Sequence, residues 1–477
     1  MLKRGPIIVI GIVIVLLLAA PLAIGMFIEG GLRDQIEIYD RTAAWSASVE
    51  NYDQGWLDSR ANVNIGLSPA YLEQMAAVDP SMGIATMLGD LSIPIIVDFS
   101  HGPLLLDGGF GVGSATVRAY VDPDSPMVAM AEQVLGMPYL FELRGRGGFG
   151  TGFRFEGEIP PSENAFPDGS YTFSGLQFSG TSDNGNFVLD AVIDNLTLQS
   201  AFFSAILESM TVAYDYQYRP DRIGLGDFEL AIASVVASNP LLGSEPLLSA
   251  DGVRIGSTVT EHEGGAHVDM HATIDLDGLS VIDAFSLSDT ALGVSFEHFD
   301  SAAMFDLKSL TTAIPPGADE AQVLALMMPI FDRIVAGDPA LSLEPMRFSM
   351  PEGDFDGKLD VALDSSVLPN GSVADLENPQ IAMEAISANL ELTCSKTLAK
   401  DLMTLSLSQQ MAAQMGPDAP PLPPEQVEAM VDQQFAALVA QGMLTDNGDT
   451  YSTTIAFADG VATVNGTPLP LGAMGLF

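Results

Sequence analysis

The sequence is poor in basic residues and in cysteine. Only 18 Lys and Arg stand against 62 Asp and Glu, which gives a formal net charge of −44 at pH 7. Such a surface repels phosphate backbones, and this excludes nucleic acid as a partner. Cys394 is the single cysteine, which excludes an intramolecular disulfide and a cysteine-rich metal site. We interpret Cys394 as a small apolar residue in a helix rather than as a nucleophile.

A recognisable catalytic motif is also lacking. No Gly-x-Ser-x-Gly segment lies between a predicted strand and a predicted helix. The glycine-rich residues 145–152 have the composition of a phosphate-binding loop, but Phe153 and Phe155 continue as a strand, so we interpret the segment as a hairpin. The sequence therefore predicts a protein that is not an enzyme and that needs no cofactor.

The many acidic residues are scattered singly along the chain and do not form an acidic tail. This distribution favours a strongly solvated surface, as in an organism that lives in high salt, where screening reduces self-repulsion. A surface that binds divalent cations diffusely is the alternative.

A long apolar run is present near the N-terminus. Residues 6–28 contain no charged side chain. As a helix they would span ~34 Å at ~1.5 Å per residue, enough for a hydrocarbon core of ~30 Å. The run is longer than the ~7–15 apolar residues of a cleaved signal peptide. Because Lys3 and Arg4 precede it, we expect an uncleaved single-pass anchor in a bacterial inner membrane, with the bulk of the chain in the periplasm.

Alternating apolar and polar residues follow this run over much of the chain. In residues 267–277 the apolar side chains occupy every second position from Val268 to Leu276, which predicts a strand with one polar face. Residues 187–193 and 358–364 show the same period. Such alternation is typical of antiparallel sheets with one solvated face.

The helical periods between these strands complete the predicted fold. The class is α+β: an N-terminal transmembrane helix followed by an elongated antiparallel β-meander body with interspersed helices. We expect a cytoplasmic stub and anchor at 1–28, a β-rich periplasmic region with a helical stalk at 29–310, and a mixed helical and β region at 311–477. The expected helices cover residues 30–48, 69–88, 127–135, 318–335, 376–414 (with interruptions) and 424–444.

Three short segments match a known pattern. Residues 51–60, NYDQGWLDSR, are followed by a His-Gly-Pro segment and, near the C-terminus, by an Asn-Gly turn. In this order, and behind an anchor, they resemble the YdgA family of bacterial envelope proteins. The matching residues are Tyr52, Gly55, Trp56, Ser59, His101, Gly102, Pro103, Asn465 and Gly466.

This resemblance implies a periplasmic or inner-membrane protein of undefined molecular role and brings no catalytic residues. By a looser analogy of fold, the β-meander body also resembles AsmA-type proteins, whose long sheets are implicated in envelope lipid homeostasis. From the residues themselves, we interpret Trp56 as a core residue beside a bend that Gly55 permits, with Tyr52 packed across from it, rather than as part of a ligand-binding notch. We expect His101 to end a strand.

The only cluster of histidines is EHEGGAHVDMH, at residues 261–271. His267 and His271 share one face of the predicted strand but lie ~13 Å apart, too far to bind one zinc ion on a straight strand. His262 could approach them across the Gly264-Gly265 turn. We name His262, His267 and His271 as candidate metal ligands and favour a solvated strand face over a metal site.

Two functions from different classes remain. The leading one is a non-enzymatic scaffold, or a module that binds lipid or another envelope protein, in envelope maintenance. It follows from the predicted anchor and from a mean hydropathy of +0.28, because a sheet with one apolar face must cover it with helices, a partner or an acyl chain. The alternative is a metal-dependent envelope hydrolase that uses residues 261–271. A homo-oligomer that acts as a structural spacer also stays open.

Overall fold

The computed structural model describes most of the chain beyond residue 44. None of the helices within the described residues is both long and apolar enough to cross a membrane. The predicted anchor at 6–28 lies outside these residues, as do Gly102 and Pro103 and most of the helix predicted at 69–88. The described residues are 29, 32–33, 45–68, 71–72, 92–101, 104–105, 111–112, 115–148, 152–243, 245–282, 284–313, 320–415 and 423–469.

Antiparallel strands make up most of these residues, and they divide into two compact units. One unit contains the described residues up to Ala201 together with Glu208–Val212, and the other contains Phe202–Leu207 and the residues from Ala213 onward. Strand β13 (Ser204–Gln217) contributes residues to both. The domain boundaries predicted at residues 28 and 310 remain predictions.

The first unit is an antiparallel sheet in which β12 (Asn186–Ser200) pairs with β11 (Leu176–Asp183) through its first half and with β10 (Gly169–Phe173) through its second half. Helix α4 (Pro126–Leu135) packs beside β9, and Ser125 caps its first turn. A separate two-stranded pair consists of β4 (Leu104–Leu105) and β5 (Gly111–Val112). In order of pairing, the sheet contains β1 (Trp45–Gln54), β2 (Asp58–Leu67), β3 (Ser92–His101), β6 (Ala115–Val121), β7 (Glu142–Gly147), β8 (Phe153–Ile159), β11 (Leu176–Asp183), β12 (Asn186–Ser200), β10 (Gly169–Phe173) and β9 (Ser162–Phe166).

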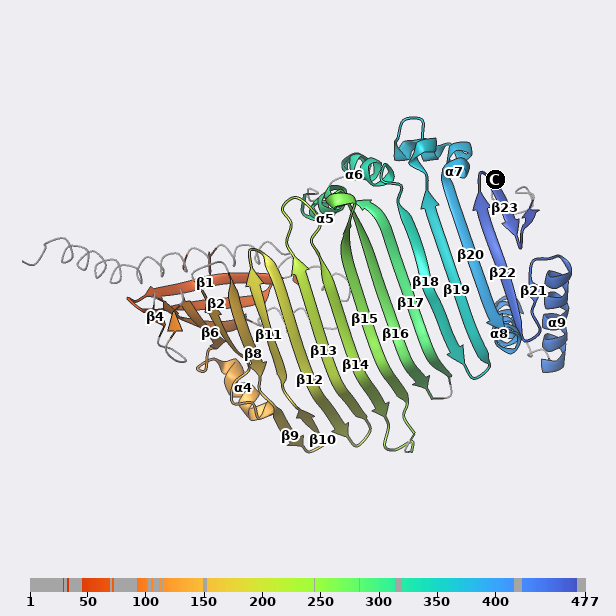
Figure 1. The fold of residues 1–477 in the computed structure, drawn as a ribbon. Coiled ribbons are helices and arrows are strands. Elements are labelled where there is room, and N and C mark those ends of the chain that lie inside the picture. Colours follow the sequence, from red (N-terminus) through yellow and green to blue (C-terminus); the bar gives the residue numbers. More distant parts are fainter. Residues whose placement is uncertain are drawn as a thin grey trace, which may run out of the picture. The chain divides into compact units, whose positions relative to one another are not determined.

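The second unit is a meander of long strands with helices at both ends of the strands (Figure 1). Helices α5 (Ser301–Ala313), α6 (Glu320–Val335) and α7 (Pro379–Ala385) lie at one end, and α8 (Lys396–Met415) and α9 (Pro424–Ala440) lie at the other. Short β21 (Thr445–Asp446) also pairs with β22. In order of pairing, the strands are β14 (Leu225–Ser238), β15 (Leu248–His262), β16 (His267–Val281), β17 (Phe285–Asp300), β18 (Ala340–Met350), β19 (Gly353–Leu363), β20 (Ile386–Ser395), β22 (Thr450–Ala458), β23 (Val461–Val464) and β24 (Thr467–Leu469).

Most of the predicted elements that fall in the described residues are confirmed, and two predicted helices, 30–48 and 376–414, are wrong in part. The strands predicted at 187–193, 267–277 and 358–364 lie in β12, β16 and β19, and α4, α6 and α9 match three predicted helices. Residues 45–48, predicted as helix, begin β1 instead. Residues 386–395, also predicted as helix, form β20, because pairing with β19 and β22 on both sides supplies more hydrogen bonds and contacts than an isolated helix would.

Cys394 therefore lies in a strand, which corrects its predicted helical context. It is half-buried, and burial raises the pKa of its thiol. A raised pKa keeps the thiol neutral at physiological pH, which favours the structural role predicted for it.

The glycine-rich segment at 145–152 joins two paired strands, β7 and β8, as predicted for a hairpin. Gly145 in this segment and Gly157 in β8 make room for phenylalanine rings. A Cβ atom built at Gly145 would lie 2.0 Å from the ring of Phe153, and one built at Gly157 would lie 2.2 Å from the ring of Phe178. A glycine has no side chain that could pack on the sheet. The aromatic ring that lies over it buries apolar surface at that position, and this burial stabilises the sheet.

We expect Gly145→Ala to destabilise the protein by about 1–3 kcal/mol, because the new methyl group overlaps the Phe153 ring and overpacking has a cost of this size. Gly152→Ala, in the same segment, is the matched control, since a Cβ atom there meets no atom within 4 Å. Urea denaturation of both variants measures the difference. Equal effects of the two substitutions would contradict the packing role of Gly145.

Candidate functional site

Two of the three matching sequence segments, residues 51–60 and the His-Gly-Pro segment, are in contact in the first unit. The Oγ of Ser59, in β2, lies 2.9 Å from Nε2 of His101, at the end of β3, and the backbone N–H of His101 donates to the carbonyl of Leu57. Ser59 is 4% exposed and His101 is 1% exposed. A serine nucleophile must reach its substrate, so this degree of burial favours a structural link between neighbouring strands. The expectation that His101 ends a strand is confirmed.

Gly55 and Trp56 lie in the turn between β1 and β2. The N–H of Gly55 donates to the carbonyl of Asp58, and a Cβ atom at Gly55 would lie 2.3 Å from that oxygen, so only glycine fits the turn. The bend predicted at Gly55 is confirmed. The core position predicted for Trp56 is wrong, because Trp56 is 48% exposed. Tyr52 instead packs on the cluster formed by Ala61, Val63, Val97 and Phe99.

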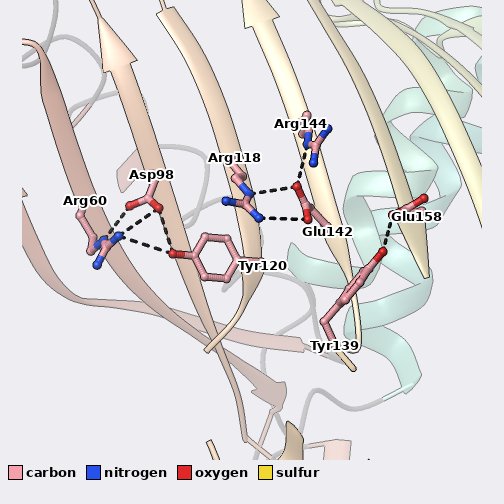
Figure 2. Close-up of polar contacts among 8 residues, drawn as sticks. All are labelled: Arg60, Asp98, Arg118, Tyr120, Tyr139, Glu142, Arg144 and Glu158. Atoms are coloured by element: carbon pink, nitrogen blue, oxygen red, sulfur yellow. Dashed lines mark hydrogen bonds and ion pairs between the residues drawn. The ribbon is translucent and has the colours of Figure 1, made fainter. Parts of the chain in front are cut away.

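The polar face of the same sheet carries a ladder of arginines and acids across neighbouring strands (Figure 2). Arg60 in β2 binds Asp98 in β3 through two hydrogen bonds of 2.6 and 3.1 Å. Tyr120 in β6 donates to the same carboxylate at 2.9 Å. Farther along, Tyr139 donates to Glu158. The register places Arg60, Asp98 and Tyr120 on one face of the sheet, so the contacts among them cross neighbouring strands.

Glu142, in β7, is the acceptor at the centre of this ladder. Arg118 binds it through bonds of 2.9 and 3.2 Å, and Arg144 donates to its Oε1 at 2.6 Å. The hydrogen bond from Arg118 is the largest cause that lowers the pKa of Glu142; burial opposes it, and the bond from Arg144 adds to it. Together with Arg146 and Arg154, these two arginines line an open pocket of about 710 Å³.

No sequence motif marks this group of basic side chains. The arginines are far apart in the chain, and only strand register brings Arg118, Arg144 and Arg60 onto one face. Locally, the sequence shows only two of the arginines close together, in Arg-Gly-Arg at 144–146, and the glycines around them are typical of a hairpin. The register pairs Arg118 with Arg144, and Glu142 bonds to both, so this carboxylate connects the strands that carry them.

The lowered pKa of Glu142 predicts a pH-dependent contribution to stability. A depressed carboxyl pKa stabilises the fold above the group's unfolded pKa of ~4.3 and loses this effect as the pH falls through the folded pKa. We expect Glu142→Gln to lower the free energy of unfolding by about 1 kcal/mol at pH 7, since both arginines are more than half exposed and solvent screens the pair.

At pH 3 the difference between wild type and Glu142→Gln should shrink. Urea denaturation at both pH values measures it. The control is Glu156→Gln, which removes an exposed carboxylate from the neighbouring strand of the same face. A difference for Glu142→Gln that stays constant with pH would contradict the assignment.

The three candidate histidines of residues 261–271 do not form one site. The Nδ1 atom of His271 lies 2.7 Å from the Oγ of Ser295, along the strand from the others. His262 instead joins Asp269 and His298, and one potential ligand atom from each lies within 4.8 Å of the other two. His267 pairs with His262 across the hairpin of β15 and β16. Of the three candidates, only His262 belongs to this group, and His298 was not among them.

Asn465 and Gly466 form the predicted two-residue hairpin between β23 and β24. Both have left-handed backbone conformations, with φ of 48° and 76°, as a type I′ turn requires. The Asn465 side chain also accepts a hydrogen bond from the N–H of Thr454 and donates one to the carbonyl of Gly442, each at 2.9 Å. This turn therefore ties the last hairpin to β22 and to the segment after α9.

One face of the sheet in the second unit is apolar across many strands. We define the apolar face by three cross-strand rows that the strand register gives. They are Leu230, Ile255, Ile274, Leu292 and Met346; Ala272, Val294, Leu343, Leu359, Leu390, Ile455 and Val464; and Val259, Met270, Phe296, Leu341, Val361, Ala388 and Phe457.

Among the described residues, helices cover only the ends of the apolar face. At one end Phe299 packs with α5 and α6, and at the other Tyr451 stacks on Phe435 of α9 with ring centroids 4.8 Å apart. Between them Ile274 is 43% exposed and Leu292 is 38% exposed. Large apolar side chains on a strand face at these exposures indicate a surface that the described part of the chain leaves open.

Comparison with known proteins adds a family but no function. Residues 2–472 match the family described as a bacterial protein of unknown function, DUF945. No curated protein and no solved structure matches the chain.

Proposed function

The chain belongs to this family of bacterial proteins of unknown function, and we propose that it is a non-enzymatic envelope protein that binds acyl chains of lipid on the apolar face. In this proposal residues 6–28 anchor it in the inner membrane and the two units lie in the periplasm. The observation that carries the proposal is the apolar face itself, with Ile274, Leu292 and Phe296 each at least 38% exposed.

An acyl chain fits the apolar face better than a protein segment does. The rows lie on strands whose backbone groups are already bonded to neighbouring strands, from β14 to β22. The face therefore offers few donors or acceptors to a polypeptide, which would bring polar backbone groups that need partners. An acyl chain needs none, and each buried methylene contributes about 0.8 kcal/mol.

The proposed location rests on the sequence. The uncharged run at 6–28 and the two preceding cations favour an anchor with the rest of the chain exported. The motif residues support the YdgA resemblance, and Ser59 and His101 from two of its segments are in contact in the buried part of the first unit. A sheet tethered beside a bilayer has lipid at high local concentration, which suits a role in envelope maintenance.

Protease added to intact spheroplasts tests the location. We expect it to digest both units, because the positive charges before residue 6 keep only the N-terminal stub inside. A cytoplasmic marker protein must stay intact in the same sample. A chain that resists protease until the membrane is disrupted would contradict the proposed orientation.

A photoactivatable fatty acid tests the binding function on the full chain in isolated membranes. We expect cross-linked peptides from β15, β16 and β17, which carry the middle of the apolar face. Ile274→Glu should reduce labelling about tenfold, since burying an unpaired carboxylate against an acyl chain is strongly unfavourable.

The matched control for this experiment is Thr273→Glu, which places the same charge one residue earlier, on the opposite face of β16. It should label as wild type does. Equal labelling of wild type and Ile274→Glu would reject the apolar face as the binding surface, even if the location proves right.

A further inference from the structure

We propose that His262, Asp269 and His298 form a binding site for one divalent ion of a first-row transition metal. The site lies at one end of β15, β16 and β17, so that each of three neighbouring strands supplies one ligand. It is separate from the apolar face and does not depend on the proposed lipid binding.

The geometry already brings the ligand atoms together. The Nδ1 of His262 lies 3.6 Å from Oδ2 of Asp269, and the centroids of the His262 and His298 rings are 4.9 Å apart. One potential ligand atom from each residue lies within 4.8 Å of the others. Two ligands that each bind a metal at ~2.0–2.2 Å lie ~3–4 Å apart, so side-chain rotations close the remaining gap.

A bulge in β17 places His298 in the site. The register between β16 and β17 shifts between Val268 and Met270, so two residues of β17 face Asp269 alone. His298 sits in this bulge with a left-handed φ of 62°, a conformation that non-glycine residues adopt at a cost. Strict alternation from Phe296 would have put His298 on the apolar face; the bulge instead turns its ring toward His262.

Surrounding groups fix these ligands and add negative charge. Asp269 accepts the backbone N–H of His298 on Oδ1 at 2.8 Å, which orients the carboxylate with Oδ2 toward His262. The Nδ1 of His298 lies 3.4 Å from the carbonyl of Asp338. Carbonyl partners of this kind fix the tautomer of metal-binding histidines.

Gly337 allows the loop that carries Asp338 to lie against the histidines. A Cβ atom at Gly337 would lie 2.5 Å from the carbonyl oxygen of His298 and 3.1 Å from the His267 ring. The Asp338 carboxylate accepts the backbone N–H of Ser365 at 2.7 Å, and a carboxylate in this loop favours the approach of a cation.

The donor set indicates the class of metal. Two imidazoles and one carboxylate suit zinc, iron(II), cobalt or nickel, whereas calcium and magnesium take oxygen ligands. Three protein ligands leave coordination positions for water. A bound ion would join three strands at once and would stabilise the folded chain in proportion to its affinity.

Zinc titration of the full chain, purified in detergent and treated with chelator, tests the site by calorimetry. We expect one zinc ion per chain, and a loss of affinity of at least roughly 10-fold in His262→Ala and in His298→Ala, since losing a ligand costs no less than losing a group that only orients one. His271→Ala is the matched control, because this histidine contacts Ser295 and lies outside the cluster. It should bind zinc as wild type does.

Two further measurements keep the result unambiguous. Asp269→Asn retains an oxygen to accept the N–H of His298 but removes the charge, so it should fold as wild type and still bind zinc more weakly. Calcium should not compete for the site; competition would indicate binding by the acidic surface. An absence of stoichiometric zinc binding in wild type, or equal affinity in wild type and His298→Ala, would overturn the proposal.

Discussion

The backbone hydrogen bonds between antiparallel strands are the constraint on which the rest of this protein depends. They fix the register, and the register decides which side chains share a face. In the first unit this brings Arg60, Asp98 and Arg118 into one ladder. In the second it aligns the rows of the apolar face across β14 to β22. The faces, rather than any single motif, give the molecule its chemistry.

A shift in the strand register changes which way a single side chain points. The bulge in β17 turns His298 out of the apolar alternation and beside Asp269. Glycines act in a similar way on the sheet of the first unit, where Gly145 and Gly157 leave space for aromatic rings from adjacent strands. The bulge and the glycines each change what packs or points at one position and leave the pairing of the surrounding strands in place.

Sequence reasoning recovered what depends on local periodicity and failed where distant strands decide. The alternation in residues 267–277 predicted β16, and Asn465-Gly466 predicted a tight hairpin, because a period of two and a two-residue turn are encoded locally. Residues 386–395 also alternate apolar and polar side chains, a strand period that the helix prediction for 376–414 overlooked, and pairing with β19 and β22 holds them as β20. His298 could not be found from spacing, since its place follows from a bulge that the sequence does not mark. Trp56 was assigned to the core by its residue type alone, whereas the turn leaves it 48% exposed.

The uncovered apolar face also bears on how copies of this protein behave in concentrated solution. Two such faces would bury each other readily, since within the described residues no helix covers the strands between the two ends of the apolar face. The net charge of −44 opposes that encounter at long range, because like-charged bodies repel before their apolar surfaces come close. Dissolved salt shortens the reach of this repulsion to a Debye length of about 8 Å at physiological ionic strength. The acidic side chains therefore keep copies of the protein apart in solution, and the ionic strength sets the distance over which their repulsion acts.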